Sequence, residues 1–291
     1  MEPAGVLRRV TMPALTLLAV LALVVNPASA WERPEKVNLA YIEVVGPGPS
    51  LWEMSNEGAA CATVDEAFTP VSDGALGADF TQSDAFDDGL VVTVQVGSTT
   101  KDLSDRDGFL EVGEDDVLVD GIKVGGLKLS RTERVLDTSP TLRSLISFRN
   151  PTDAPVTAQV WWDSNLGSDG GEAARATASG DTTFDVSDGW VVTSDDATTP
   201  GDPVLTFALF GAGARVTPRE VVDGPGSGCM TIRYRIRVPA HATRHLLFFT
   251  QMSETNEQAI ARAPKFDAPT ERMLTGLSPK VRAAIVNWDL S

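Results

Sequence analysis

Residues 142–162, which read LRSLISFRNPTDAPVTAQVWW, decide the fold class. Two runs rich in β-branched and aromatic residues flank the segment NPTD at 150–153, where the proline presets the φ angle of a turn. In the second run Trp162 shares a face with smaller apolar residues, whereas Trp161 falls on the opposite face among polar neighbours. A strand, a tight turn and a second strand are therefore predicted here.

Strand patterns recur along most of the chain. Residues 231–238 (TIRYRIRV) alternate perfectly, and residues 244–250 (RHLLFFT) follow after a short turn, which predicts a hairpin. Residues 117–124 (VLVDGIKV) predict another hairpin, because Asp120-Gly121 suits a type I′ turn between two apolar runs. Further strands are predicted at 37–45, 89–96, 127–136 and 203–210, and irregular segments at 50–85 and 99–116.

The last forty residues change to helical patterns. A helix is predicted at about 253–263, where Thr255 and Gln258 are spaced as a capping box. A second helix is predicted at about 278–289, starting with Ser278 as its N-cap and burying an apolar stripe that includes Trp288. We expect this helix to lie on a sheet.

These patterns predict a mainly β fold. Because no linker or shift in composition separates the strands, we expect a single domain over residues 31–291. Its architecture should be an antiparallel two-sheet β-sandwich with short C-terminal helices, or a larger version that resembles the mutarotase-like supersandwich in architecture alone. No sequence motif identifies a family.

Residues 1–30 have the composition of a signal peptide. Arg8 and Arg9 precede an apolar run at 12–25, and the small residues at 27–30 (PASA) suit a cleavage site. No later apolar run reaches the length of about 20 residues needed to span a bilayer. We therefore expect a secreted protein that acts outside the cell or in a periplasm.

The charge balance is strongly acidic. The net charge is −16, and removal of residues 1–30 takes away two arginines and one glutamate, which leaves a net charge of −17. Such a chain repels nucleic acids and anionic membrane surfaces, so we expect neither as a partner.

Two cysteines, Cys61 and Cys229, are present. In an oxidising compartment an isolated pair usually forms a disulfide, which is what we predict. The alternative is a pair of buried free thiols.

The loop predicted at 163–172 (DSNLGSDGGE) is the candidate metal site. Asp163, Asn165 and Asp169 offer the oxygen ligands that calcium prefers. Their spacing does not match an EF-hand loop, and turn chemistry alone also produces such a composition. An acidic segment at 102–116 has a similar composition and would complete the site if the two loops met.

Arg233, Arg235 and Arg237 form a basic stripe on the outward face of their strand. Either the stripe binds an anion such as an acidic polysaccharide, or it pairs with acids on neighbouring strands. Trp161, which also points outward, either stacks on a sugar or packs beneath another sheet or a helix. These four residues are the candidate ligand site.

Catalytic patterns are weak. The two histidines, His241 and His245, flank one predicted turn, and no G-x-S-x-G motif accompanies them. We therefore predict a secreted, non-catalytic β-sandwich protein that serves as a carbohydrate-binding or cell-envelope structural module. The alternative is a carbohydrate-active enzyme of hydrolase or epimerase type that uses two of the many carboxylates.

Overall fold

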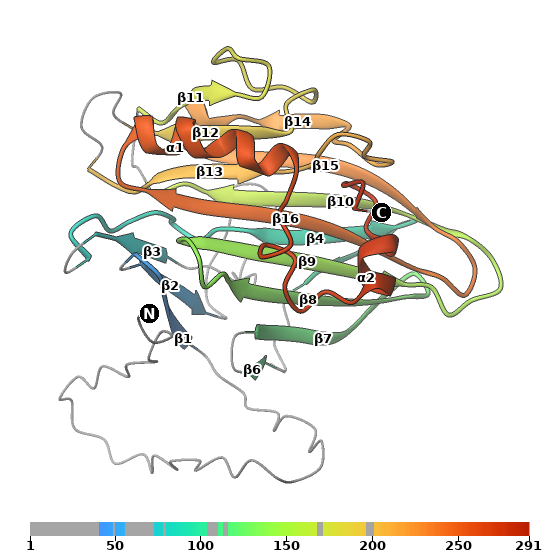
Figure 1. Cartoon of the computed structure of the whole chain (residues 1–291). Coiled ribbons are helices and arrows are strands. Elements are labelled where there is room, and N and C mark those ends of the chain that lie inside the picture. Colours follow the sequence, from blue (N-terminus) through green and yellow to red (C-terminus); the bar gives the residue numbers. More distant parts are fainter. Residues whose placement is uncertain are drawn as a thin grey trace, which may run out of the picture.

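The computed structural model describes residues 41–48, 50–55, 73–77, 80–103, 110–112, 116–167, 171–195 and 201–290. The strands of these residues form three antiparallel sheets (Figure 1). The small sheet has the order β1 (Tyr41–Gly46), β2 (Ser50–Ser55), β3 (Asp73–Leu76). The five-stranded sheet has the order β14 (Glu220–Asp223), β15 (Cys229–Val238), β10 (Val156–Asn165), β4 (Val91–Val96), β5 (Thr99–Asp102). The eight-stranded sheet has the order β11 (Ala173–Thr177), β12 (Trp190–Ser194), β13 (Val204–Ala208), β16 (Thr243–Ser253), β9 (Thr141–Arg149), β8 (Leu127–Val135), β7 (Asp116–Val124), β6 (Leu110–Val112).

The inner faces of the sheets share one apolar core, which confirms the predicted sandwich. Alternation sends every second residue of β15 and β10 inward, so that Tyr234 and Trp162 are buried. The Trp162 ring lies 5.3 Å from that of Phe207 on the eight-stranded sheet, in an edge-to-face contact. The small sheet adds Trp52 and Met54 to the same core. Burial of each such side chain stabilises the fold by about 1.5–3 kcal/mol.

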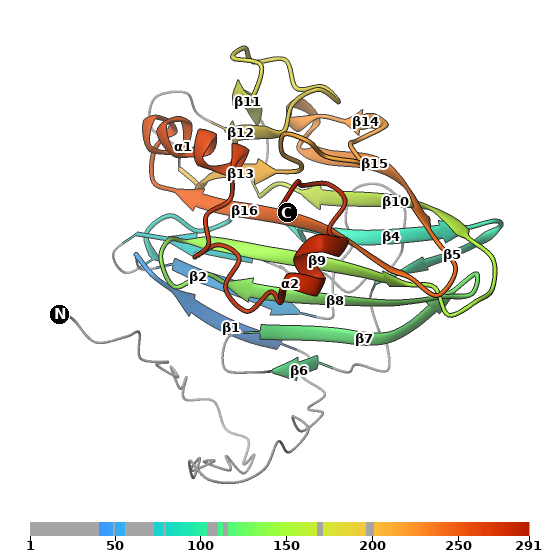
Figure 2. The ribbon, with the colours of Figure 1, turned by 45° about the vertical axis from the view of Figure 1, so that its right-hand side comes forward.

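The C-terminal segment covers the other face of the eight-stranded sheet (Figures 1 and 2). It contains the helices α1 (Asn256–Arg262), η3 (Ala263–Asp267) and α2 (Pro279–Ala284), and another short helix, η2 (Pro225–Ser227), precedes β15. Beneath this cover the Phe249 ring lies 5.7 Å from that of Trp288. The Trp288 indole donates a hydrogen bond of 2.7 Å to the Leu247 carbonyl. The cover therefore builds a second apolar core.

The helix starts follow the prediction, but the second helix is shorter than expected. The Thr255 side chain caps α1 by accepting from the Gln258 amide, and Ser278 caps α2 by accepting from the Val281 amide. α2 ends at Ala284, and Ile285 instead pairs with His245 in an isolated bridge. Trp288 is buried as predicted, but it lies beyond the helix, because the chain extends there to follow the sheet.

Both predicted tight turns at one end of the sandwich are corners between sheets. β9 and β10 belong to different sheets, as do β15 and β16, so the hairpin predicted at 231–250 is wrong. Buried Asn150 holds the two corners together: its side-chain amide donates to the carbonyls of Ala154, Val238 and Pro239 at 2.8–3.1 Å. A local turn signal does not specify whether the next strand stays in the same sheet.

The predicted Asp120-Gly121 hairpin is also wrong. β7 runs straight through these residues, and its register against β8 shifts between Val119 and Ile122. Gly121 has a φ of 90°, which suits a β-bulge as well as a type I′ turn. The turn lies instead at Gly125-Gly126, where both φ angles are positive.

The segments predicted as irregular and the predicted signal peptide have different outcomes. The segments predicted as irregular contain β2, β3, β5 and β6, whose short runs lack clear alternation. The signal peptide at 1–30 lies outside the described residues and stays a prediction. No helix among the described residues is long and apolar enough to cross a membrane.

Candidate functional site

Trp161 lies near the middle of the outward face of the five-stranded sheet. It sits on the central strand β10, opposite Arg233 of β15 on one side and Thr93 of β4 on the other. The side chain is partly exposed, and α1, η3 and α2 all pack on the eight-stranded sheet instead. Trp161 is therefore an outward aromatic side chain that no described helix covers.

The three stripe arginines share the face of Trp161 but differ in their distance from it and in their partners: Arg233 is directly opposite, and Arg235 and Arg237 follow two and four residues along the strand. Arg233 forms an ion pair of 2.5 Å with Glu220 of β14, directly opposite it. Arg235 and Arg237 are exposed and form no ion pair with any described residue. The pairing alternative thus holds for one arginine, and two guanidinium groups remain available to an anion.

Amide side chains extend this surface along the strands. Arg235 lies opposite Gln159, whose side-chain amide donates to that of Gln95 at 3.2 Å. Arg237 lies opposite Thr157 at the end of the sheet. We call Trp161, Arg235, Arg237, Gln159 and Gln95 the outward platform. It combines an aromatic face, two cations and neutral hydrogen-bonding groups, which together suit an anionic, hydroxyl-rich ligand.

Two of the three predicted metal ligands lie in a strand and not in a loop. Asp163 and Asn165 belong to β10, which continues three residues further than expected. The Asp163 carboxylate is buried and accepts a 2.8 Å hydrogen bond from the Thr231 hydroxyl. Asp169 lies outside the described residues, among which no group of three or more His, Cys, Asp or Glu side chains could hold a metal ion. Calcium binding therefore stays a prediction.

Of the two cysteines in the predicted disulfide, only Cys229 lies within the described residues. Cys229, the first residue of β15, carries no free thiol. Cys61 lies outside the described residues, so its pairing with Cys229 stays a prediction.

The two histidines do not meet. His241 lies at the exposed corner and contacts the Asp153 carboxylate through Nε2 at 2.9 Å. His245 is buried on the eight-stranded sheet, where Nδ1 lies 2.8 Å from the Ser147 hydroxyl. Burial, with a smaller contribution from the charge of Arg244, lowers the pKa of His245 to about 4. No carboxylate among the described residues hydrogen-bonds to His245, so the Ser–His pair lacks the acid of a catalytic triad.

A row of carboxylates crosses the small sheet, and the sequence analysis missed it. Glu43 lies opposite Glu53, which in turn lies opposite Asp73. The pKa of Asp73 is raised to about 6, mainly by burial and also by the charges of Glu53 and Asp84, while the backbone amides of Gly74 and Phe86 oppose the rise. The residues around Asp73 had been predicted as irregular, so their shared row could not be foreseen.

A buried ion pair was also missed. Arg131 and Glu133 point into the sandwich between the sheets, where they pair with each other. Arg131 also donates to the Leu90 carbonyl, and the Ser144 hydroxyl donates to Glu133 at 2.5 Å. The alternation LKLSRTERV carried the signal, because it places both charges on the same face as Leu127 and Leu129.

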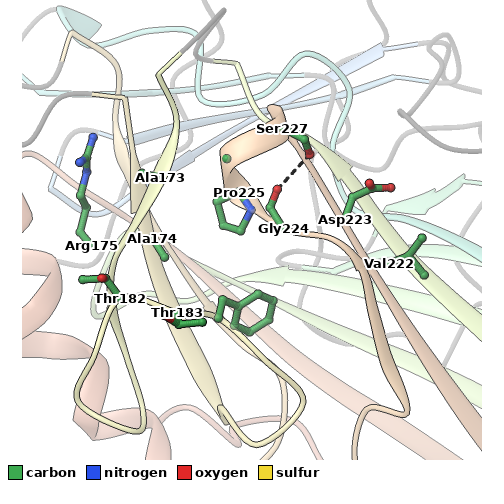
Figure 3. Close-up of a pocket in the computed structure, with 12 residues that line it drawn as sticks. Ala173, Ala174, Arg175, Thr182, Thr183, Val222, Asp223, Gly224, Pro225 and Ser227 are labelled. Carbon is green, nitrogen blue, oxygen red and sulfur yellow. Dashed lines mark hydrogen bonds between the residues drawn. The ribbon is translucent and has the colours of Figure 1, made fainter.

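A cavity of about 840 Å³ lies between the edge strands β11 and β14 (Figure 3). Arg175 and Asp223 stand on opposite sides of it, and the Ser227 hydroxyl donates to the Gly224 carbonyl at 2.9 Å. Arg175 is held by Ser194, to whose hydroxyl and carbonyl it donates. The lining does not include Trp161. The cavity is therefore distinct from the outward platform.

Comparison with known proteins gives similarity of fold alone. No protein-family model matches the chain, and no curated protein matches it. A polysaccharide lyase structure aligns with a TM-score of 0.44 at 12% identity, over 80% of this chain and 35% of the lyase. A protein from Synechocystis sp. PCC 6803 aligns with a TM-score of 0.41 at 10% identity, over 79% of this chain and 100% of that protein.

A galactose mutarotase-like protein from Lactobacillus casei aligns with a TM-score of 0.42 at 10% identity, over 73% of this chain and 100% of that protein. The chain thus spans about a third of the lyase and the whole of the two smaller proteins. Similarities this remote carry no argument about what the chain binds or catalyses.

Proposed function

We propose that this protein is an exported, non-catalytic module that binds acidic polysaccharide through the outward platform. The observation that supports it is the position of Trp161, a half-buried outward aromatic side chain on the central strand of its sheet, on the same face as Arg235 and Arg237, two exposed arginines that form no ion pair with any described residue. The exposed part of the indole offers an apolar contact surface to a ligand or partner.

Each part of the platform suits one part of an acidic sugar. The indole face packs against the apolar face of a sugar ring. The planar guanidinium groups of Arg235 and Arg237 bind carboxylate or sulfate groups with paired hydrogen bonds. Gln159 and Gln95 offer donors and acceptors to hydroxyl groups.

The proposal includes an extracellular or periplasmic location. It rests on the signal-peptide pattern of residues 1–30 and on the cysteine pair. N-terminal sequencing of the exported protein would test it: the expected first residue is Trp31, and an intact N-terminus inside the cell would contradict it.

Binding assays with defined oligosaccharides test the ligand class. Calorimetric titration with hexagalacturonate and with a sulfated heparin-derived hexasaccharide should give binding that maltohexaose does not give. Trp161→Ala should weaken it roughly tenfold or more, since an aromatic anchor often contributes 2 kcal/mol or more. Arg235→Gln/Arg237→Gln should also weaken it, with Lys265→Gln/Arg272→Gln as the matched control. Equal losses in both double variants would show a general charge effect and overturn the site.

One observation favours a second candidate, a carbohydrate-active enzyme. Asp73, with its raised pKa, lies directly opposite Glu53, and paired carboxylates with unequal pKa values catalyse glycoside hydrolysis. The two described cavities do not include Asp73, so the binding proposal stands first. Release of reducing sugar from these oligosaccharides, lost in Asp73→Asn and Glu53→Gln, would establish the enzyme and overturn the non-catalytic proposal.

A further inference from the structure

Three cations lie in one cross-strand row on the eight-stranded sheet. Lys123 of β7 lies opposite Lys128 of β8, and Lys128 lies opposite Arg149 of β9. Residues directly opposite on neighbouring strands have Cβ atoms about 4.5–5.5 Å apart, so three positive side chains project side by side. We call these three residues the basic row.

The basic row lacks the acids that would normally accompany it. All three side chains are exposed, and none forms an ion pair with a described residue. Of the acids nearest in sequence, Asp120 accepts from the Gly121 amide and Asp153 contacts His241. Like charges directly opposite one another weaken a sheet. In a chain with 40 acidic and 24 basic residues, such a row is unexpected unless it has a role.

Hydroxyl groups adjoin the basic row. Thr243 of β16 continues it beyond Arg149. Two residues further along the strands, Ser130 lies opposite Ser147, which lies opposite His245. These residues share the face of the basic row, because side chains two positions apart on a strand point the same way. The surface therefore offers cations at one edge and hydroxyl groups beside them.

The basic row and the outward platform lie on opposite sides of the sandwich. Trp161 points away from the core on the five-stranded sheet, and Lys128 points away from the core on the eight-stranded sheet. Both surfaces extend to the end of the sandwich where Asn150 joins the two corners. Arg149 of the basic row precedes Asn150, and Arg237 of the platform precedes Val238, whose carbonyl accepts a hydrogen bond from the Asn150 side chain. A ligand bound to one surface leaves the other accessible.

We propose that the basic row is a second binding surface for acidic polysaccharide, so that one protein molecule engages two polysaccharide segments. The choice of acidic polysaccharide as the ligand rests on the proposed function, whereas the location of the second site rests on the three cations of the basic row. Carboxylate or sulfate groups spaced along a sugar chain offset the repulsion among the three cations, and hydroxyl groups meet those of Ser130, Ser147 and Thr243. Single-stranded nucleic acid is disfavoured because the described surroundings of the row offer hydroxyl groups and no exposed aromatic ring for base stacking, and duplex nucleic acid is an outcome of the test.

The test is a titration of the full mature chain at low ionic strength, with whichever of the two acidic hexasaccharides binds more tightly. Wild type should bind two molecules per chain. Lys123→Gln/Lys128→Gln should bind one, or bind the second roughly tenfold more weakly, as two surface charge contacts allow. Arg235→Gln/Arg237→Gln should also bind one. The control Lys265→Gln/Arg272→Gln should bind two, and unfolding midpoints establish that each variant is folded.

The outcomes separate the two proposals. One molecule bound per wild-type chain, unaffected by Lys123→Gln/Lys128→Gln, would overturn the second surface and leave the outward platform standing. If wild type binds one hexasaccharide molecule and only Lys123→Gln/Lys128→Gln abolishes that binding, the outward platform is overturned and the basic row stands. Tighter binding of duplex DNA than of either hexasaccharide, lost in the same variant, would make nucleic acid the partner and overturn the polysaccharide assignment.

Discussion

The two outward faces of the sandwich both carry large aromatic side chains, but the helices of the C-terminal segment cover only one of them. On the eight-stranded sheet, Phe249 is 0% and Trp190 7% exposed, because the C-terminal segment packs over them. The Trp190 indole also donates a 3.0 Å hydrogen bond to Asp267 of that segment. On the five-stranded sheet, Trp161 has no such cover and lies beside exposed arginines.

The difference separates structural from functional aromatic residues. Burial of an indole beneath a helix contributes to folding free energy, whereas an indole left in the open contributes little. The same residue type at the same kind of position should therefore have opposite phenotypes on the two faces. Variants on one face should lose stability, and variants on the other should lose binding.

The largest expected effect comes from Trp288→Ala on the covered face. It leaves a cavity against Phe249 and removes the hydrogen bond to Leu247, so the free energy of unfolding should fall by about 3–5 kcal/mol. Trp161→Ala should change it by less than about 1 kcal/mol. Urea denaturation of both variants measures this. Similar losses in both would show that Trp161 is a structural residue.

Between the two faces, the buried Arg131–Glu133 pair gives the next test. Glu133→Gln leaves Arg131 charged and without its partner inside the core, which should cost about 3–5 kcal/mol. Replacement of both residues, as in Arg131→Met/Glu133→Leu, should cost much less or nothing, because no charge stays buried. Urea denaturation again measures it. A double variant less stable than the single one would show that the pair itself stabilises the core.

The smallest expected effect lies on the outward face of the small sheet, which carries the acids Glu43, Glu53 and Asp73. The folded-state pKa of Asp73, about 6, lies above the ordinary value, so its protonated form favours folding. This contribution is fully present below the unfolded pKa of about 4 and is lost as the pH rises through 6. The unfolding midpoint should therefore decline as the pH rises from about 4 to above 6. Asp73→Asn should make this decline smaller, and the exposed control Asp137→Asn should leave it unchanged. Solvent screening keeps the effect small.

Local sequence patterns predicted the fold class and which residues point outward, but they could not predict which strands pair with one another. The alternation of β15 placed Tyr234 inside and three arginines outside, and the structure agrees. The sequence could not show that β15 and β16 join different sheets, because a turn and a corner use the same local chemistry. Gly121 is a similar case, since a positive φ serves a bulge or a hairpin.

The candidate site was limited in the same way. Trp161 and the arginine stripe follow from period-two alternation alone. The pairing of Arg233 with Glu220 and the alignment of Lys123, Lys128 and Arg149 depend on register between strands far apart in sequence. Asp73 was missed because its four-residue strand has no detectable period.

The difference between the covered and open faces can be measured through the indole N–H resonances. In a proton–nitrogen correlation spectrum of the isotope-labelled protein, addition of the acidic hexasaccharide should shift the Trp161 signal. The signals of Trp162, Trp190 and Trp288 should stay in place, since these side chains are buried. Shifts of the buried indoles with an unchanged Trp161 signal would contradict the proposal that the open face is the binding surface.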